Sequence, residues 1–291
     1  MNISKRLDKL VQTADKCRVL ADIGCDHGYV GISAIQRGKA DTVIAADVAA
    51  GPLNAARINA ESEGVTDRMH FVISDGFSAI PDESGIQCAV IAGMGGILMR
   101  DILKAGRLDR FKEIRQLVLS PQSDIDLVRR HVIEVMHGKI VCEHVMFDEG
   151  KYYFILDVRL NDNSGDGCVT DDKTETRPVL NTEDDTDSTK AGHQNVYRGS
   201  ASGHEAYDEA EYYYGKNISD DSVGTYIDYL HFRQKISEKA RKAAAAGGSC
   251  SGRIKAAELG RQLEYIQTIL SRYALNYPAE AGEKEELKRH D

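Results

Sequence analysis

Apolar residues follow two alternating patterns along the first 160 residues. Short, uninterrupted apolar runs are typical of strands buried on both faces of a sheet, whereas apolar residues three or four positions apart are typical of helices. The first pattern predicts strands at 18–24, 42–48, 69–76, 88–96 and 116–122. The second predicts helices at 1–16, 30–38, 51–64, 97–106 and 124–138. This alternation favours a doubly wound α/β domain with a mostly parallel sheet covered on both faces.

The segment 139–160 predicts a hairpin at the end of this domain. Its two apolar stretches flank the turn Asp148-Glu149-Gly150, and short turns of this kind join neighbouring antiparallel strands. The hairpin therefore adds an antiparallel edge of two strands to the five predicted before it. We expect residues 1–160 to form one domain.

Residues 161–207 differ from everything before them. The stretch is polar, acidic and poor in aliphatic residues, so it buries too little apolar surface to offset the entropy lost on ordering. We predict a flexible insertion there, and an acidic stretch that mimics nucleic acid is the alternative. A connecting segment at 208–222 is expected to return the chain to the core.

The C-terminal residues show the spacing of a coiled coil. Apolar residues alternate at intervals of three and four along 253–277, at Ala256, Leu259, Leu263, Ile266, Leu270, Tyr273 and Tyr277. A looser stripe precedes them, at Tyr229, Phe232, Ile236 and Ala243. With the Gly/Ser-rich stretch 247–252 between the two patterns, we predict a helical hairpin over 223–277 and a polar tail at 278–291. A monomer is expected, and a dimer through these helices is the alternative.

Charge and cysteine usage narrow the function classes. The formal net charge is −9, but residues 161–222 hold 15 acidic and 5 basic residues, which leaves 31 acidic and 32 basic residues elsewhere. This balance permits a phosphate-rich partner without demanding one. The six cysteines show no CxxC pair and no histidines at zinc-ligand spacing, and no apolar run is long enough to cross a membrane. We expect a cytoplasmic protein with reduced thiols, no metal and no membrane segment.

The loop after the first predicted strand carries the first candidate chemistry. A strand that ends on Asp22 and runs into Gly24 and Gly28 is how doubly wound sheets build nucleotide sites at their carboxyl edge. The dinucleotide pattern GxGxxG is absent, because Asp26 and His27 occupy its interior. Carboxylates repel a pyrophosphate, so the loop favours a ligand with a cationic centre, such as the sulfonium of S-adenosylmethionine. A plain tight turn is the alternative.

Two further predicted strands end on acidic residues. Asp47 follows Asp22 by 25 residues, close to the interval of about 20 at which an acidic side chain meets a ribose diol. Asp75, before Gly76, ends the third strand, where a carboxylate can accept a hydrogen bond from an adenine amino group. Taken alone, Asp47 is equally well explained as a solvated loop residue. The three strand ends together predict an adenosine site that needs no metal.

The turn Gly93-Met94-Gly95-Gly96 after the fourth predicted strand is almost free of side chains. Glycine N–H groups before a helix can bind a phosphate, a bare backbone can admit a flat ring, and glycines can simply turn a corner. The turn lies on the side where a methyl group would leave the cofactor. We therefore interpret its bareness as space for a flat adenine.

Several motifs occur in the order and spacing typical of one family. They are DIGCDHGYV (22–30), AADVAAGPLNAA (45–56), SDGF (74–77), IAGMGG (91–96) and EGKYYFI (149–155). On these motifs the chain resembles the bacterial tRNA adenine-22 N1-methyltransferases over residues 1–160, and more loosely in its C-terminal helices. The resemblance implies a Rossmann-like methyltransferase sheet, S-adenosylmethionine as cofactor, and methyl transfer to N1 of an adenine in the D-arm of tRNA.

The resemblance also implies roles for individual residues. The methionine and sulfonium end of the cofactor is expected at Asp22, Gly24, Cys25, Asp26, His27 and Gly28. The rest of the cofactor site is expected at Asp47, Val48, Asp75, Gly76, Gly93 and Met94. The catalytic candidates are Asp26 or His27 as proton acceptor, Gly95 beside the target base, and Gln122 at its edge. Ser120-Pro121-Gln122-Ser123 stands where the family often has Gln-Pro-Asn, so no role of that Asn is transferred.

Basic residues predict the contacts with RNA. They are Lys5, Arg6 and Lys9 near the N-terminus and Arg233, Lys239, Arg241 and Lys242 on the C-terminal helices. Scattered cations of this kind give affinity for phosphates, although solvation alone also explains the charged faces of a helical hairpin. Two rival functions stay open: a methyltransferase acting on a protein or small molecule, and a non-catalytic RNA-binding protein of the same fold.

Overall fold

The computed structural model describes residues 3–160, 206–247 and 249–276. The strands are β1 (Cys17–Ile23), β2 (Ala40–Asp47), β3 (Met69–Ile73), β4 (Cys88–Ala92), β5 (Gln116–Ser120), β6 (Lys139–Asp148) and β7 (Lys151–Arg159). The α-helices are α1 (Lys5–Thr13), α2 (Tyr29–Gln36), α3 (Ala50–Ser62), α4 (Gly96–Ala105), α5 (Ile125–Arg130), α6 (Glu209–Tyr214), α7 (Val223–Ala246) and α8 (Cys250–Asn276). Short helical turns are η1 (Thr66–Arg68), η2 (Asp82–Ser84), η3 (Leu108–Arg110), the π-helical η4 (His131–Val135) and η5 (Asp220–Ser222).

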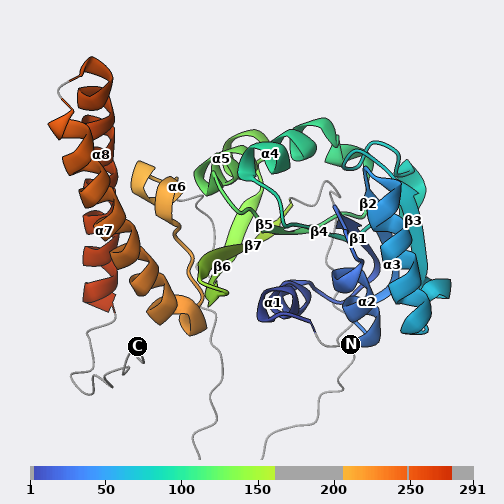
Figure 1. The fold of residues 1–291 in the computed structure, drawn as a ribbon. Coiled ribbons are helices and arrows are strands. Elements are labelled where there is room, and N and C mark those ends of the chain that lie inside the picture. The colour runs from blue at the N-terminus through green and yellow to red at the C-terminus, as the bar shows by residue number, and fades with distance from the viewer. Residues whose placement is uncertain (1–2, 161–205, 248, 277–291) are drawn as a thin grey trace, which may run out of the picture. The chain divides into compact units, whose positions relative to one another are not determined.

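The seven strands form one sheet in the order β3-β2-β1-β4-β5-β7-β6 (Figure 1). β1 to β5 pair in parallel, and β7 lies antiparallel between β5 and β6. This arrangement confirms the predicted doubly wound sheet with an antiparallel hairpin at its edge. The strand order reverses between β1 and β4, and ligands of such sheets bind outside the carboxyl ends of the strands at this point.

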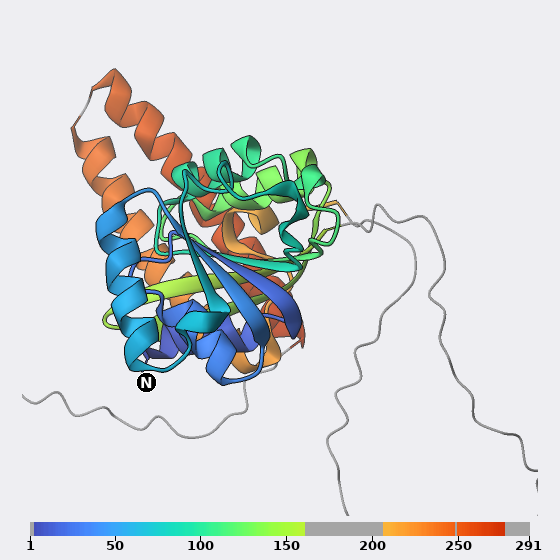
Figure 2. The ribbon, with the colours of Figure 1, turned by 90° about the vertical axis from the view of Figure 1, so that its right-hand side faces the viewer.

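Helices cover both faces of the sheet, because the side chains of the buried strands alternate between two apolar cores. In β4, Cys88 and Val90 join one core with α1, α2 and α3, whereas Ala89 and Ile91 join the other with α4 and α5. Figure 2 shows this layering from the side of β3 and α3. Continuous apolar strands are required for this double burial, which is why the unbroken runs in the sequence predicted them correctly.

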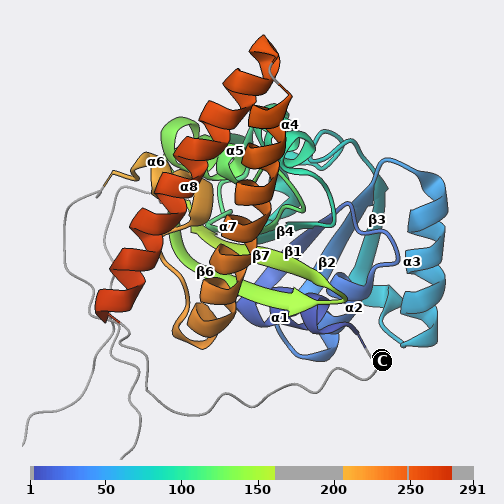
Figure 3. The ribbon, with the colours of Figure 1, turned by 60° about the vertical axis from the view of Figure 1, so that its left-hand side comes forward.

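The two long C-terminal helices pack against each other and against the β6–β7 end of the sheet (Figure 3). Tyr226 and Leu230 of α7 share a core with Ile266 of α8 and with Phe154 of β7. The predicted helical hairpin is thus confirmed, and the apolar residues between α7 and α8 are buried against each other within one chain. No helix among the described residues is both long enough and apolar enough to cross a membrane.

The details of the two helical patterns differ from the prediction. Leu259, Leu263 and Ile266 are buried as expected, but Ile269 is more buried than Leu270, because an α-helix drifts by about 20° per heptad from a strict coiled-coil repeat. The stripe predicted on α7 is wrong in part: Tyr229 packs against the core shared with α8, but Phe232 and Ile236 are 47% and 45% exposed. Since α7 also packs on the sheet, it buries a different set of residues, namely Val223, Tyr226, Leu230 and Ser237.

After the predicted insertion, which lies outside the described residues up to 205, the chain returns to the sheet edge. The N–H of Glu143 in β6 donates to the carbonyl of Asn217 at 2.7 Å, and the N–H of Ser219 donates back to the Glu143 carbonyl at 2.9 Å. Beneath this segment Arg129 Nη2 donates to Glu143 Oε2 at 2.7 Å, with both side chains fully buried. Arg129 Nη1 also donates to the carbonyl of Tyr212 at 2.9 Å, which fastens α6 to the domain.

Candidate functional site

The loop after β1 turns tightly, with three of its residues in the left-handed backbone conformation. Gly24 and Gly28 both have φ of 72°, and Asp26 has φ of 48°, a region that non-glycine residues rarely adopt. The N–H groups of Gly24 and Cys25 both donate to the carbonyl of Ala46, at 2.8 and 3.1 Å. A Cβ on Gly28 would lie 2.8 Å from Cβ of Ala56. The loop therefore lies closely against the end of β2 and the middle of α3.

Asp22 does not present its carboxylate at the open edge. Its side chain lies in the interior, 4% exposed, and its Oδ2 accepts a hydrogen bond from the N–H of Gly31 in α2 at 3.1 Å. Burial raises the pKa of Asp22 to about 7, against the hydrogen bond from Gly31 that lowers it, and the charge of Asp47 raises it further. The side chain of Asp22 thus holds the first turn of α2, and its contact with the cofactor stays a prediction.

Asp47 links the two neighbouring loops. Its Oδ1 accepts from the N–H of Ala49 at 3.0 Å, and its Oδ2 accepts from the N–H of Asp26 at 3.3 Å. The adjacent Val48 is 71% exposed. A carboxylate next to an open apolar side chain suits a sugar hydroxyl beside a flat ring, and the sequence predicted both residues.

The end of β3 supplies the third acidic residue. Asp75 is exposed, whereas Gly76 is buried with φ of 57°, and a Cβ there would lie 2.7 Å from Cγ2 of Ile102. The predicted site residue Gly76 is therefore required by the close approach of α4. Ser74, which the sequence did not single out, fixes this turn: its Oγ donates to the carbonyl of Gly76 at 2.9 Å and accepts from the N–H of Ala79 at 3.0 Å.

The carboxylates of Asp26, Asp47 and Asp75 are at least partly exposed and share one edge of the sheet. Within the described ranges none of them forms an ion pair with a lysine or arginine. The nearest basic atom to Asp26 is Nε2 of His27, at 3.7 Å, and both side chains are more than half exposed. This unpaired negative charge favours a cationic ligand and opposes a phosphate.

The remaining loop residues divide into exposed and buried ones. The His27 ring stacks on Tyr29 with centroids 5.5 Å apart, and Asn59 Nδ2 donates to the His27 carbonyl at 2.9 Å. Sequence reasoning missed Asn59, because nothing local marks a helix residue that reaches a loop 32 positions away. Cys25 is 7% exposed, and burial raises the pKa of its thiol. Its predicted part in the site is thus limited to the backbone.

The glycine turn after β4 is bare for two different reasons. Gly93 has φ of 81° and would meet no atom within 4 Å, so it faces open space. A Cβ on Gly96 would lie 2.4 Å from the carbonyl oxygens of Ser123 and Asp124. The expectation that the whole turn leaves space for a ring is therefore wrong for Gly96, whose position is filled by the loop after β5. Met94 fills space too, since its Cε would lie 2.9 Å from a Cβ at Gly24.

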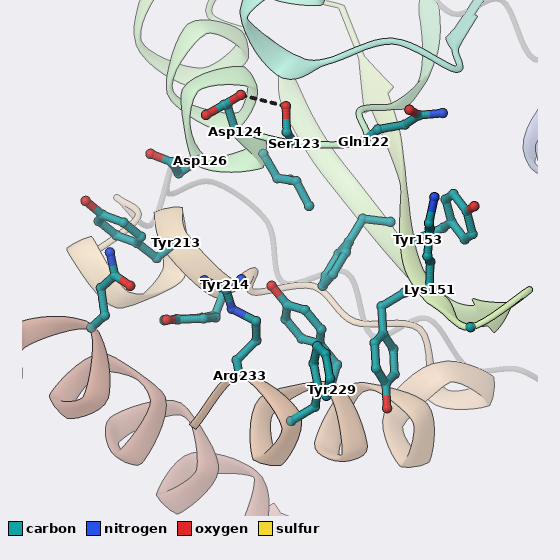
Figure 4. A pocket seen from close by; sticks show the side chains of 16 residues that line it. Gln122, Ser123, Asp124, Asp126, Lys151, Tyr153, Tyr213, Tyr214, Tyr229 and Arg233 are labelled. Carbon is teal, nitrogen blue, oxygen red and sulfur yellow. Dashed lines mark hydrogen bonds between the residues drawn. The ribbon is translucent and has the colours of Figure 1, made fainter. Parts of the chain in front are cut away.

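The loop after β5 is bound to this turn. The N–H of Gln122 donates to the Met94 carbonyl, and the N–H of Gly96 donates to the Ser123 carbonyl, both at 2.9 Å. Gly95 lies beside the same loop, because a Cβ there would be 3.1 Å from Oγ of Ser123. The exposed side chain of Gln122 lines a cavity of about 570 Å³ (Figure 4). The structure thus brings Gly95 and Gln122 close together at the ends of β4 and β5, and their part in methyl transfer stays a prediction.

The predicted RNA contacts are only partly available. Lys9 Nζ forms an ion pair with Asp221 at 2.8 Å, and Arg6 lies with its guanidinium carbon 5.0 Å from the centroid of the Tyr153 ring. Arg233 lines the cavity. The remaining candidates are exposed, on α1 or α7: Lys5, Lys239, Arg241 and Lys242. No group of three or more His, Cys, Asp or Glu placed to hold a metal occurs among the described residues.

Comparisons with known proteins agree with this geometry. A family model described as a methyltransferase domain matches residues 3–156. The tRNA (adenine(22)-N(1))-methyltransferase of Bacillus subtilis is 30% identical over 156 residues, which cover 54% of this chain and 64% of that protein. The match thus spans less than two thirds of that relative's length.

Two solved structures share the fold over most of the described chain. The B. subtilis tRNA methyltransferase TrmK superposes with a TM-score of 0.69 at 20% identity, covering 92% of this chain and 99% of that one. M. capricolum TrmK in complex with S-adenosyl-homocysteine gives 0.67 at 19% identity, covering 92% and 98%. At these identities the likeness establishes the fold, including the C-terminal helices.

Proposed function

This chain belongs to the methyltransferase domain family, and we propose that it transfers a methyl group from S-adenosylmethionine to N1 of an adenine in tRNA. The main support for the proposal is the negative charge of Asp26, Asp47 and Asp75 at the carboxyl ends of β1, β2 and β3, which no lysine or arginine of the described residues pairs. A sulfonium nucleoside has the matching charge and carries no phosphate. The B. subtilis relative is named for methyl transfer to N1 of adenine 22 of tRNA.

The residues at the carboxyl edge fit this cofactor. Asp47 would take the ribose hydroxyls, and Asp75 would accept from the adenine amino group. The exposed side chains of Val48 and Ile73, 71% and 61% exposed, offer apolar surface to the purine. The loop 24–28 would surround the methionine end with backbone groups, and Met94 packs against it where a side chain on Gly24 would lie. When bound, S-adenosylmethionine supplies an electrophilic methyl group.

The protein's own part in the transfer is alignment and proton handling. N1 of adenine is itself a nucleophile, so orientation contributes more to the rate than acid catalysis. Gln122 can hydrogen-bond an adenine edge through its amide, and the bound loop 122–123 fixes its backbone. As the base becomes cationic, Asp26 or the adjacent His27 can accept the N6 proton, since both side chains are exposed.

The partner and cellular context follow from the same proposal. Lys5, Lys239, Arg241 and Lys242 would contact phosphates, whereas Lys9 is neutralised by Asp221. The apolar residues between α7 and α8 pack against each other within one chain, which supports a monomer. We infer a cytoplasmic location, because the proposed substrate is tRNA.

Methyl incorporation tests this function. The purified protein is incubated with methyl-labelled S-adenosylmethionine and, in separate reactions, unmodified tRNA transcripts, a protein extract and a metabolite extract. We expect label in tRNA alone. Label in protein or in small molecules would establish the rival substrate class. Cofactor binding without any incorporation would instead support the non-catalytic alternative.

A further inference from the structure

The cavity beside Gln122 is separate from the acidic edge. It is lined by the loop 122–126, the start of β7, the end of α6, the residues 229–233 of α7 and Gln262 of α8. None of the carboxylates assigned to the cofactor lines it. Figure 4 shows Lys151 and Tyr153 on the β7 side, Tyr213 and Tyr214 on α6, and Tyr229 and Arg233 on α7.

Aromatic rings dominate the walls of this cavity. Tyr152 lies 5.4 Å from both Tyr229 and Phe232, and Phe154 lies 4.9 Å from Tyr229, between ring centroids. Phe232 lines the cavity while it is 47% exposed. A large aromatic side chain left open in a cavity offers its face to another flat ring, and base stacking on such faces is tolerant of sequence.

Charged groups in the cavity complement the other parts of a nucleotide. Lys151 and Arg233 form no ion pair within the described part of the chain, and Nε of Arg233 is buried without a hydrogen-bond acceptor there. Cations placed in this way suit a phosphate. On the opposite wall Asp124 and Asp126 can accept from an exocyclic amine of a base. An acidic peptide would be repelled by these carboxylates, and it would leave the aromatic faces without a stacking partner.

The distance between the cavity and the glycine turn limits which nucleotide the cavity can hold. The glycine turn follows β4, the loop 122–126 follows β5, and the far wall begins β7. Two strand spacings, about 10 Å, separate β4 from β7. Stacked neighbours in a nucleic-acid strand are only about 3.4 Å apart, so an occupant next to the target adenine has to be unstacked.

We propose that this cavity binds a nucleotide adjacent to the target adenine, splayed out of the RNA stack. The base stacks on Phe232 and Tyr229, and its phosphate contacts Arg233 and Lys151. This inference rests on the proposed function, because it requires RNA as the partner. It makes α7 part of the substrate site itself and explains why its apolar residue at 232 is left uncovered.

Phe232→Ala and Ile236→Ala form a matched pair for the test, because both residues are half exposed on α7 and only Phe232 lines the cavity. Affinity is measured for an unmodified tRNA transcript and for transcripts with an abasic site immediately 5′ or 3′ of the target adenine. We expect Phe232→Ala to weaken binding of intact tRNA roughly 5- to 150-fold, as for one lost stacked base, with Ile236→Ala near wild type. One abasic transcript should weaken wild type by a similar factor and Phe232→Ala no further.

Equal tRNA affinity of the two variants, or independent losses from the variant and the abasic site, would overturn the proposal. Arg233→Gln gives a second readout: it should reduce the slope of log affinity against log salt by about 1, and an unchanged slope would argue against the phosphate contact. A wild-type protein that binds tRNA without methylating it would refute the proposed function and leave the pocket result standing. Failure to bind tRNA at all would refute both.

Discussion

The two ends of the sheet present opposite chemistry. At the β1–β3 end, consecutive loops leave carboxylates such as Asp26, Asp47 and Asp75 unpaired. At the β7–β6 end, aromatic rings and the cations Lys151 and Arg233 surround a cavity. The first is built from short motifs at the ends of their strands, whereas the second needs five segments spread over more than 100 residues. The carboxylates of the first end therefore follow from local sequence, whereas the cavity forms only where the C-terminal helices pack against the sheet.

Arg129 tests how much the β7–β6 end of the sheet contributes to stability, because it pairs with Glu143 of β6. Arg129→Leu leaves the buried Glu143 without its partner and frees the backbone carbonyls of α6, so we expect the free energy of unfolding to fall by about 3–5 kcal/mol. The neighbouring Arg130 pairs with the exposed Glu209, and Arg130→Leu should cost about 1 kcal/mol or less. Denaturant titration of the two variants checks this, and similar losses in both would contradict the role of the buried pair.

Asp22 makes the stability of the acidic end depend on pH. Its pKa rises from 3.8 in the unfolded chain to about 7 in the fold. Between these values the folded state keeps a proton that the unfolded state has lost, so stability falls as pH rises through this window. We expect wild type to lose about 3 kcal/mol relative to Asp22→Asn between pH 5 and pH 8. Parallel stability curves of the two proteins would show that this carboxylate is not responsible.

Asp47 tests the cofactor side directly. Asp47→Ala removes a charged hydrogen-bond acceptor worth about 1.5–3 kcal/mol, so affinity for S-adenosylmethionine should fall roughly tenfold to a hundredfold in calorimetry. Asp41→Ala is the control, because Asp41 is exposed near the opposite end of the same strand. Unchanged affinity in Asp47→Ala would remove Asp47 from the ribose site, and equal weakening in both would indicate a general charge effect.

Gly96 tests how tightly the turn after β4 packs against the loop after β5. Gly96→Ala forces a Cβ against the carbonyls of Ser123 and Asp124, so we expect a loss of about 1–3 kcal/mol in stability. Gly51→Ala in α3 meets no atom within 4 Å and should be neutral or stabilising by about 0.4–1 kcal/mol. Thermal unfolding of both variants decides the matter, and a Gly96 variant as stable as wild type would show that the loop after β5 can move away.

The acidic end could largely be predicted from the sequence, because Asp26, Asp47 and Asp75 each follow a strand whose apolar pattern is clear. The local pattern does not show which of these residues are buried. Asp22 serves α2, and Gly96 is bare because another loop approaches it. Both facts depend on neighbours distant in the sequence. A stripe of apolar residues likewise does not show which side of a helix meets the sheet, so the spacing predicts Phe232 in the apolar stripe of α7, whereas in the structure it lines the cavity.

The identity of the methylated atom tests the central claim most directly. An unmodified tRNA transcript is incubated with the protein and S-adenosylmethionine, digested to nucleosides for mass spectrometry, and mapped in parallel by reverse transcription. We expect 1-methyladenosine at a single adenine in the D-arm, with a reverse-transcription stop beside it because N1 methylation blocks base pairing. A methyl group on N6, on another base or on no part of the tRNA would contradict it.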